Sequence, residues 1–567
     1  MIRIFISFFL ILFFATSSDA QQLTYTVKLK YKYNPSYTLA QPSSFLSQKA
    51  IARRNRQNIQ IDSTDLPINK SYLDSITRIN GVIIKSKSKW LNQVIIEITD
   101  PSAIDAINAF SFVHQSKVVG TAFAPQLKKV APEKIETESN VILGSKSVLD
   151  GQGTTADTLN YGNNYPQVHI HEGEYLHNKG FQGQGITIAV IDAGFYNYRN
   201  SIAFDSVVRN NQILGVFDFV AKDSSVDEDN PHGAYCLSIL AANRPGFMVG
   251  TAPKANYLLF RTEDVTSEKP IEEQNWIEAL ERADSMGADM VSSSLGYYNF
   301  EDSLYNHTYI ERDGNTAQIT IAADIAAKKG MIIMNAAGNT GNATDESKYI
   351  LVPADGDSVM TVGAVNTSGT IAGFSSWGPN GAGKTKPNIV SVGWSAVYAN
   401  IFGIPTTGNG TSYANPNIAG LIACLWQAFP EFTNMEILNA VERSADKYNN
   451  PDDRYGYGIP NFRIASSILE TKRQEKTDKI LNGKWLTAFP IPFKQVFTVF
   501  IKAPATGRAN LRILEFTGRV LLDKNMDVNQ GNHYRILMNP PGTRRFGMYF
   551  VQYNDGRNSS TIKLISL

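Results

Sequence analysis

The chain has 567 residues, 43% of them hydrophobic, which is enough for two or three domains with hydrophobic cores. Its 53 Lys and Arg residues balance 52 Asp and Glu residues, and this gives no support to binding of nucleic acid or acidic membranes. The two cysteines, Cys236 and Cys424, do not make a disulfide framework, and we expect both to be buried thiols.

Residues 1–20 have the pattern of a secretory signal peptide. Arg3 supplies the positive end, residues 4–14 form an apolar run, and Ser18-Asp-Ala20 is a small-x-small cleavage site. The apolar run is short for a bilayer span, so a cleaved signal is favoured over a retained membrane anchor. We therefore expect a secreted or cell-surface protein.

Residues 21–120 are predicted to form a small α/β domain. Strands are expected at 23–29, 82–84 and 93–98, and helices at 44–57 and 100–110. The first helix is basic and ends in Arg53, Arg54 and Arg56. No nucleophile or metal-ligand set is recognisable here. Residues 121–165 are polar and contain Pro125 and Pro132, which predicts an exposed, cleavable linker.

Residues 166–475 alternate apolar strands with helical stretches. Strands are predicted at 186–191, 214–219, 257–261, 290–293, 331–335 and 359–365, and helices at 271–286 and 319–329. This alternation predicts a parallel sheet with helices on both faces, whose working residues lie at the carboxyl ends of its strands.

The last region, residues 480–567, changes to short strands separated by turn residues. The strands are expected at 497–501, 511–516, 520–522, 534–538, 548–553 and 561–565. This pattern predicts a small all-β sandwich.

Ser412 lies where a small-residue loop meets an apolar helical pattern at 418–429. The amides at a helix N-terminus can stabilise a developing negative charge. Pro416 is expected in the first turn of that helix, where its missing N–H costs little. Taken alone, Ser412 or Thr411 is most simply a helix cap.

Three other polar residues follow strands or open a helix in the same region. Asp192 ends a predicted strand, His232 begins a helical pattern, and Asn339 comes just after another strand. Acyl transfer by a serine needs a base, a carboxylate that orients the base, and donors for the oxyanion. Each residue alone is most often a turn or cap residue, but together these four supply every part.

Over residues 165–475 the chain resembles the subtilases, whose catalytic residues occur in the order Asp, His, Ser. The motifs that carry the resemblance are Ala189-Val-Ile-Asp-Ala-Gly194, Asn230-Pro-His-Gly-Ala-Tyr-Cys236, Asn335-Ala-Ala-Gly-Asn339, Thr407-Gly-Asn-Gly-Thr-Ser412, Gly250-Thr-Ala-Pro253, Ser293-Ser-Leu-Gly296, Phe374-Ser-Ser-Trp-Gly-Pro379 and Lys386-Pro-Asn-Ile-Val390. The resemblance implies an α/β, subtilisin-like parallel sheet.

The resemblance also implies a role for each site residue. Ser412 would be the nucleophile, His232 the general base and Asp192 its orienting carboxylate, with Asn339 and the Ser412 N–H as the oxyanion hole. The segments expected to bind the substrate and line the specificity pocket are Ser294, Leu295 and Gly296, and Ala336, Ala337 and Gly338. Leu295 and the Ala/Gly wall predict a pocket open to large apolar side chains.

The chain departs from the usual subtilase motifs near the catalytic groups. Ala193 replaces a Ser or Thr, and Ala234 and Tyr235 follow the His-Gly pair. Tyr413, Asn415 and Asn417 surround the serine with more polar bulk than is usual. These changes concern the hydrogen bonds around the catalytic groups and the shape of the pocket.

The two flanking regions also resemble known domains. The first, by position, size and pattern, is similar to a subtilase propeptide, which assists folding and blocks the cleft until it is cut. The last is similar to the C-terminal sorting domains of type IX secretion, although Phe489-Pro-Ile-Pro492 lacks their usual Asn. A carbohydrate- or surface-binding sandwich is the alternative.

Two groups of residues have the composition of metal sites. His169, His171 and His177 with Glu172 and Glu174 are interpreted as an ordinary surface entry helix. Asp223, Asp227, Glu228 and Asp229 match no defined calcium loop and are interpreted as a solvated acidic loop. We assign no metal ligand; no cofactor is expected to be required, and structural calcium is left open.

The expected function is that of a secreted serine endopeptidase made as a zymogen. Its expected partners are protein or peptide substrates, its own propeptide and secretion machinery. The alternatives are a catalytically silent surface-binding protein with this fold, and a dedicated maturation protease with one partner substrate.

Overall fold

The computed structural model describes residues 23–121, 138–142, 157–539 and 546–567. The predicted signal peptide and most of the predicted linker therefore lie outside the described residues. The chain divides into two compact units, Met1–Ala465 and Ser466–Leu567. Within the described residues, no helix has the length and apolar character needed to span a membrane.

The N-terminal part of the first unit is an antiparallel sheet in the order β2-β3-β1-β4. Its elements are β1 (Leu23–Leu29), α1 (Gln48–Arg56), α2 (Lys70–Thr77), β2 (Val82–Ser88), β3 (Gln93–Ile98), α3 (Ala103–Asn108) and β4 (Val113–Thr121). The sequence missed α2 and β4. It also placed the start of α1 too early, because Ser47 caps the helix by accepting a hydrogen bond from the Ala50 amide.

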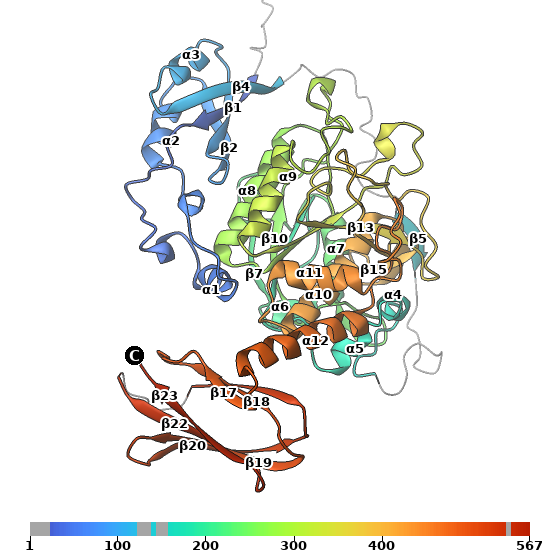
Figure 1. The fold of residues 1–567 in the computed structure, drawn as a ribbon. Coiled ribbons are helices and arrows are strands. Elements are labelled where there is room, and N and C mark those ends of the chain that lie inside the picture. Colours follow the sequence, from blue (N-terminus) through green and yellow to red (C-terminus); the bar gives the residue numbers. More distant parts are fainter. Residues whose placement is uncertain (1–22, 122–137, 143–156, 540–545) are drawn as a thin grey trace, which may run out of the picture. The chain divides into compact units, whose positions relative to one another are not determined.

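A seven-stranded, all-parallel sheet forms the centre of the first unit, in the order β14-β13-β12-β11-β6-β10-β7 (Figure 1). The strands are β6 (Thr187–Asp192), β7 (Ile213–Asp218), β10 (Asn256–Arg261), β11 (Met290–Ser293), β12 (Ile332–Ala336), β13 (Val359–Val365) and β14 (Ile389–Val392). Every residue of β6, β11, β12, β13 and β14 is buried, as expected for a parallel sheet covered on both faces.

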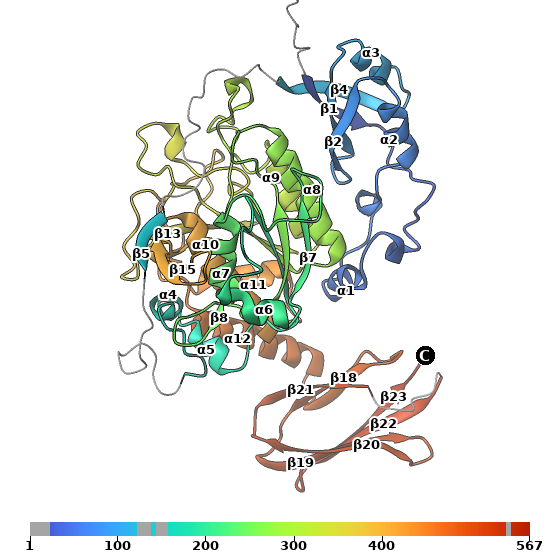
Figure 2. The ribbon, with the colours of Figure 1, turned by 180° about the vertical axis from the view of Figure 1, so that it is seen from behind.

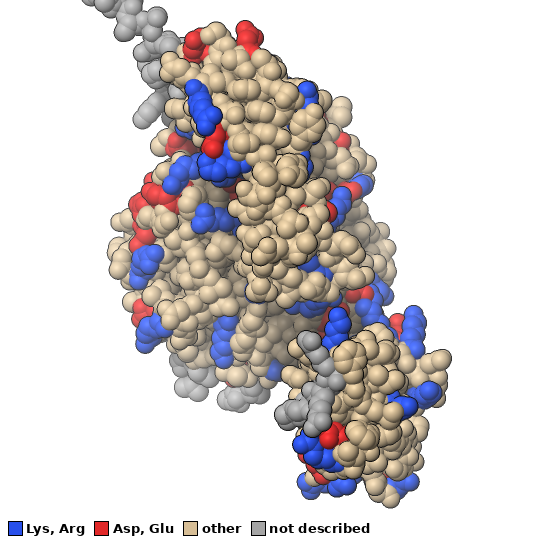
Figure 3. Space-filling view, turned by 90° about the vertical axis from the view of Figure 1, so that its left-hand side faces the viewer, with Lys and Arg blue, Asp and Glu red and all other residues tan. Residues whose placement is uncertain are grey.

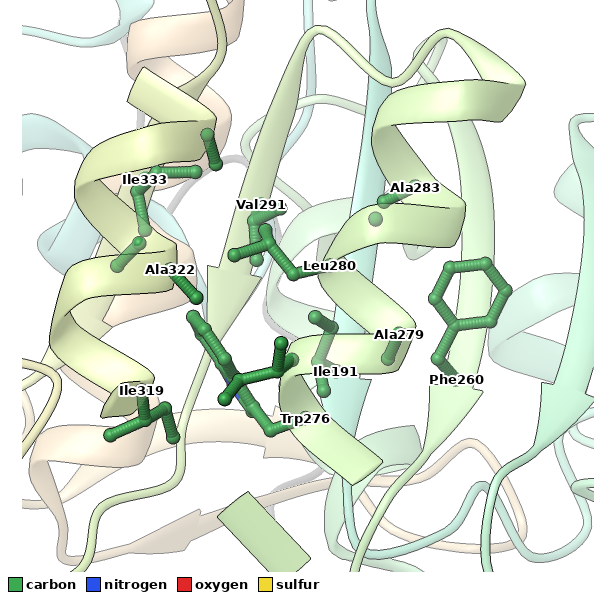
Figure 4. Packing of buried hydrophobic residues seen from close by; sticks show 14 of the residues in the cluster. Ile191, Phe260, Trp276, Ala279, Leu280, Ala283, Val291, Ile319, Ala322 and Ile333 are labelled. Carbon is green, nitrogen blue, oxygen red and sulfur yellow. The ribbon is translucent and has the colours of Figure 1, made fainter. Parts of the chain in front are cut away.

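Helices cover both faces of this sheet (Figures 1 and 2). On one face lie α8 (Ile271–Met286) and α9 (Gln318–Lys328), and on the other lie α7 (His232–Ala241), α10 (Thr411–Ala428) and α11 (Asn434–Arg443). Figure 4 shows the first face, where Trp276 and Leu280 of α8 pack with Val291 of β11. The predicted fold class is confirmed.

Helix α10 begins at Thr411, so the prediction that Pro416 lies in its first turn is wrong: Pro416 is in the second turn. A proline there has no N–H to donate to the carbonyl four residues earlier, which belongs to Ser412. That carbonyl instead accepts from Ser294 Oγ at 2.9 Å and from the Cys236 thiol at 3.4 Å. Two side chains thus replace the helix bond that the proline removes.

The short strand β5 (Glu138–Ile142) lies within the region predicted to be a linker. It pairs antiparallel with β16 (Pro405–Gly408), which forms a hairpin with β15 (Ala396–Ala399). The sequence did not indicate this strand. The free edge of β16 provides the backbone groups that pair with β5.

The second unit contains two antiparallel sheets, β17-β18-β21 and β20-β19-β22-β23. Its strands are β17 (Leu486–Phe489), β18 (Phe497–Lys502), β19 (Gly507–Glu515), β20 (Val520–Val528), β21 (His533–Met538), β22 (Met548–Asn554) and β23 (Ser559–Ile565). Val499, Leu511 and Val551 are central to one apolar core. The sequence missed β17 and the helix α12 (Phe462–Leu481) that precedes it.

Basic and acidic side chains are both spread over the face drawn in Figure 3, and no broad patch of one sign covers it. This distribution agrees with the nearly balanced charge of the sequence. The drawn face therefore offers no broad patch of one charge that could steer a highly charged polymer.

Candidate active site

Asp192 and His232 form a buried hydrogen-bonded pair at the carboxyl edge of the central sheet. Asp192 is the last residue of β6, and His232 is the first residue of α7. Asp192 Oδ1 lies 2.6 Å from His232 Nδ1, and the two side chains are 0% and 3% exposed. Because an ionised carboxylate can only accept, Nδ1 carries the proton and Nε2 is the basic nitrogen of the neutral ring.

Two glycines allow the start of α7 to approach the end of β6 this closely. A Cβ atom at Gly233 would lie 2.4 Å from the Gly194 carbonyl oxygen and 2.9 Å from Asp192 Cβ. Gly194 has a φ of +144°, and its Cβ would lie 2.7 Å from the Asn230 carbonyl oxygen. The side-chain hydrogen bond between Asp192 and His232 depends on this backbone contact.

Ser412 is the second residue of α10, where a helix has no acceptor four residues earlier for its amides. Its Oγ lies 3.3 Å from the Ser294 carbonyl oxygen. The Cys236 thiol contacts both sides of the site, at 3.4 Å from the Ser412 carbonyl oxygen and 4.0 Å from His232 Nε2. The Ser412 backbone and His232 Nε2 therefore both lie next to the Cys236 thiol.

Asn339 is tied to the start of α10 by Thr411, a residue whose role the sequence did not indicate. Asn339 Oδ1 accepts from both the Thr411 amide and the Thr411 hydroxyl, each at 2.9 Å. The same hydroxyl accepts from the Gly338 amide at 3.1 Å. These bonds to Oδ1 fix the orientation of the whole Asn339 side-chain amide. Its Nδ2 group, which carries the two N–H donors, therefore points away from Thr411.

The two segments predicted to bind substrate follow neighbouring strands. Residues 294–296 come directly after β11, and Ala336 is the last residue of β12, followed by residues 337 and 338. Leu351 lies between them: a Cβ atom at Gly296 would be 2.8 Å from its Cδ1, and one at Gly338 would be 2.9 Å from its Cγ. Both segments therefore contact Leu351, a residue that the sequence analysis did not consider.

The unusual tyrosines of the motifs pack against one another. Tyr413 stacks on Tyr398 with ring centroids 4.9 Å apart, and Tyr398 contacts Tyr235 at 4.7 Å. The Tyr413 ring lies 6.3 Å from the His232 ring. All three tyrosines are buried. The two departures at positions 235 and 413 thus form one aromatic column that connects α7, β15 and α10.

The unusual asparagines are hydrogen-bonded inside the protein. Asn415 Nδ2 donates to the Ser293 carbonyl oxygen at 3.1 Å, and Asn417 Nδ2 donates to the Gln167 carbonyl oxygen at 2.7 Å. In contrast, the buried Asp192 Oδ2 has no hydrogen-bond partner among the described residues. Ala193 follows Asp192 and has no hydroxyl that could serve it.

The surroundings of His232 shift its pKa. Burial disfavours the charged imidazolium, but the interactions of His232 with Asp192 and with Cys236 together outweigh burial and raise the pKa of His232 well above 6.5. Burial also raises the pKa of the Cys236 thiol to about 11. The thiol is therefore protonated at neutral pH.

Comparison with known proteins identifies the three regions. Residues 183–458 match the sequence model of the Subtilase family. This chain carries a subtilase domain. Residues 24–138 match the Peptidase S8 propeptide domain of Bacteroidota, and residues 487–566 match the secretion system C-terminal sorting domain.

Curated relatives of the subtilase are bacterial proteases. The chain is 29% identical to serine protease AprX of Bacillus subtilis (strain 168) and 29% identical to subtilisin E of the same strain. Each match covers 51% of this chain and 68% of the relative. A thermostable alkaline protease of Halalkalibacterium halodurans is 23% identical over 66% of this chain and 91% of the relative.

These similarities establish a subtilisin-family serine protease with a propeptide. The sorting domain indicates a secreted or cell-surface protein and confirms the predicted location. Subtilases of this kind need no organic cofactor.

The residues that resemble metal ligands have other partners in the subtilase. His171 and His177 are fully buried, so the prediction of a surface helix is wrong for them. His177 lies 2.6 Å from Tyr161 Oη through Nδ1 and donates to the Thr251 carbonyl oxygen through Nε2 at 2.9 Å. The Asp229 carboxylate lies 2.9 Å from the Arg261 guanidinium. An arginine is therefore already the cationic partner of one carboxylate in the acidic loop.

Asp192, His232 and Cys236 bring three potential ligand atoms within 4.8 Å of one another. However, Asp192 Oδ1 and His232 Nδ1 are bonded to each other, and the neutral thiol is a poor ligand. This chemistry fits an oriented imidazole better than a metal centre.

Proposed function

We propose that this subtilase is a secreted endopeptidase that hydrolyses peptide bonds through an acyl-enzyme on Ser412. His232 Nε2 removes the hydroxyl proton as Oγ attacks the scissile carbonyl, and later gives that proton to the leaving amine. Asp192 holds the imidazole in the tautomer that makes Nε2 basic and stabilises the imidazolium. The observation that carries this proposal is the buried 2.6 Å bond between Asp192 and His232.

The oxyanion hole is assigned to Asn339 Nδ2 and the Ser412 amide. The amide lies at the positive end of α10, and Thr411 fixes the other end of the Asn339 side chain. Donors held in place before the reaction need no reorganisation as negative charge develops on the substrate oxygen. Thr411 is thus proposed as a positioning residue.

The substrate is proposed to lie as a strand beside residues 294–296, with residues 336–338 forming the opposite wall of its binding site. Its side chain before the scissile bond enters the space that Leu351 narrows. We therefore propose a preference for small side chains at this position instead of large apolar ones.

A covalent probe tests this assignment. A peptidyl phosphonate, which phosphonylates an activated serine, should add once per chain, and peptide mapping should locate the adduct on Ser412. Asp192→Asn should slow the labelling strongly, because a neutral amide that can donate to Nδ1 favours the wrong imidazole tautomer and cannot stabilise the imidazolium. Labelling at another serine, or equal labelling of the two chains, would refute the proposed triad.

A further inference from the structure

The propeptide carries an arm, residues 47–65, that contacts the subtilase domain far from the proposed catalytic groups. Helix α1 of this arm lies near the C-terminal end of α8 (Figure 1). Its contacts are to Asp284, Ala288 and Asp289 before β11, and to Lys329 and Gly330 before β12. These residues lie at the amino edge of the parallel sheet, whereas Asp192, Ser294 and Asn339 lie at the carboxyl edge.

An arginine pair is buried at the centre of this contact. Arg53 and Arg54 are 1% and 0% exposed, and both donate to the carboxylate of Asp284, which is 0% exposed. Arg54 Nη2 lies 2.8 Å from Asp284 Oδ2, and Arg53 donates to Asp284 Oδ1. Each guanidinium therefore takes one oxygen of the same carboxylate.

Further acceptors complete the recess that holds the pair. Arg53 also donates to the carbonyl oxygens of Ala288 and Lys329, and Arg54 donates to Asp65 at 2.7 Å. Asp65 in turn pairs with Lys329 at 3.1 Å. An arginine guanidinium has five N–H donors in one plane, and this geometry suits the several oxygens that converge here. A lysine ammonium group does not have this planar arrangement of donors.

The flanks of the arm attach at the same edge. Lys49 pairs with Asp289 at 2.7 Å, and the Ser47 amide donates to the Ser285 carbonyl oxygen at 2.9 Å. Gln57 Nε2 donates to the Gly330 carbonyl oxygen at 2.7 Å, and its Oε1 accepts from the Asn434 amide at 3.0 Å. Gly287 lets the arm approach the end of α8 closely, because a Cβ atom at Gly287 would lie 2.7 Å from Lys49 Cβ.

The propeptide sheet makes a separate contact with α8. Glu281 accepts from Ser88 Oγ at 2.6 Å and from the amides of Lys89 and Trp90 at 2.8 and 3.0 Å. The arm and the sheet therefore hold the propeptide at two places, and neither contact uses the catalytic cleft. Separating the arm would break the charge-assisted hydrogen bonds that Arg53 and Arg54 donate to Asp284.

We propose that residues 47–65 are a clamp that keeps the propeptide bound as a lasting noncovalent subunit after the connection to the subtilase domain is cut. The acidic recess at Asp284 recognises the adjacent arginines of this chain's own arm. Because the clamp lies at the edge opposite the proposed catalytic groups, the cleft can open while the propeptide stays in place. Retention of the propeptide does not depend on the identity of the catalytic residues, whereas the position of the cleft rests on the proposed function.

The test uses the full chain with Ser412→Ala, so that no self-cleavage interferes, and with a site for a specific protease inserted between residues 122 and 137. The chain is cut to completion, immobilised through a C-terminal tag and washed, and loss of the propeptide is followed over time. We expect the propeptide to remain. Arg53→Gln with Arg54→Gln should release it at least tenfold faster.

Matched variants separate the clamp from a general effect of charge or folding. Lys70→Gln with Arg78→Gln removes two exposed propeptide cations and should leave the release rate unchanged. Arg53→Lys with Arg54→Lys keeps the charge but loses the forked donors, so its release should also be faster than that of the unmodified arm. Asp284→Asn tests the recess from the other side and should behave like the glutamine pair.

Two results would overturn the proposal. Rapid release of the unmodified propeptide would show that it is not a lasting subunit. Equal release rates for the glutamine pair, the lysine pair and the control would show that the arginines do not hold it. Neither result would bear on the proposed peptidase activity, which the serine probe measures independently.

Discussion

At the scale of single residues, Leu351 is the side chain that most changes the expected specificity. It lies between Gly296 and Gly338, and its backbone amide donates to the Ala337 carbonyl oxygen at 3.3 Å. Both sides of the proposed pocket therefore contact one residue. A leucine at this place removes volume that a large substrate side chain would need.

We predict that Leu351→Gly widens the proposed pocket. For peptides that differ only in the residue before the scissile bond, kcat/KM for Phe relative to Ala should rise by about tenfold or more, since a few buried methylene groups contribute about 1–3 kcal/mol to discrimination. Ile350→Val changes the size of a neighbouring buried side chain and serves as the control. An unchanged Phe-to-Ala ratio would place the specificity pocket elsewhere.

The pH dependence of the reaction is also a property of one residue, His232. The general base must be neutral, and Asp192 and Cys236 together raise the pKa of His232 well above 6.5 despite burial. We predict that kcat/KM rises with pH through a midpoint above 6.5, higher than an unperturbed histidine would give. In Asp192→Asn the midpoint should move down; a midpoint at or below 6.5 in the unmodified enzyme would contradict this account.

At the scale of elements, the site depends on how closely α7, α10 and the strand ends approach. The Gly233 backbone donates to the Gly194 carbonyl oxygen at 2.9 Å, and this contact sets His232 against Asp192. Thr411 connects the start of α10 to the residues after β12 through its hydroxyl and its amide. One backbone contact and one side-chain link thus hold the helix starts against the strand ends.

We predict that Gly233→Ala pushes the start of α7 away from β6 and reduces kcat by at least about 10²-fold, because displacements near 1 Å are costly in an oriented site. KM should change little, since residues 294–296 and 336–338 are untouched. Ala234→Gly, one position along the same helix, is the control for altered helix propensity. Full activity of Gly233→Ala would show that the contact has no influence on the pair.

The sequence predicted six of the seven strands of the parallel sheet, several of its covering helices and the four strand-end or helix-end residues, because buried parallel strands are continuous apolar runs and the motifs are local; it missed β14 and α11. It could not place Leu351, Thr411 or the arginine recess, because each acts on residues distant in the chain. The basic end of α1 was visible as Arg53, Arg54 and Arg56. Without Asp284 beside it, that pattern indicated only a basic helix.

At the scale of the whole molecule, the chain joins a propeptide, a subtilase domain and a sorting domain. We predict that the active protein cuts itself and that intact mass spectrometry shows a break between the propeptide and the subtilase domain. Purified Ser412→Ala should remain one chain under the same conditions. Identical trimming of the two proteins would mean that another protease makes the cut.

The most direct test of the central claim compares the purified enzyme with Ser412→Ala in the hydrolysis of casein and of small peptides. The account predicts that the unmodified enzyme cleaves and that the variant loses at least about 10³-fold in kcat, since the alanine cannot form an acyl-enzyme. Cys424→Ala, which removes a buried thiol from the same helix, should retain activity if it folds. Equal hydrolysis by the unmodified enzyme and Ser412→Ala would contradict the assignment of Ser412 as the nucleophile.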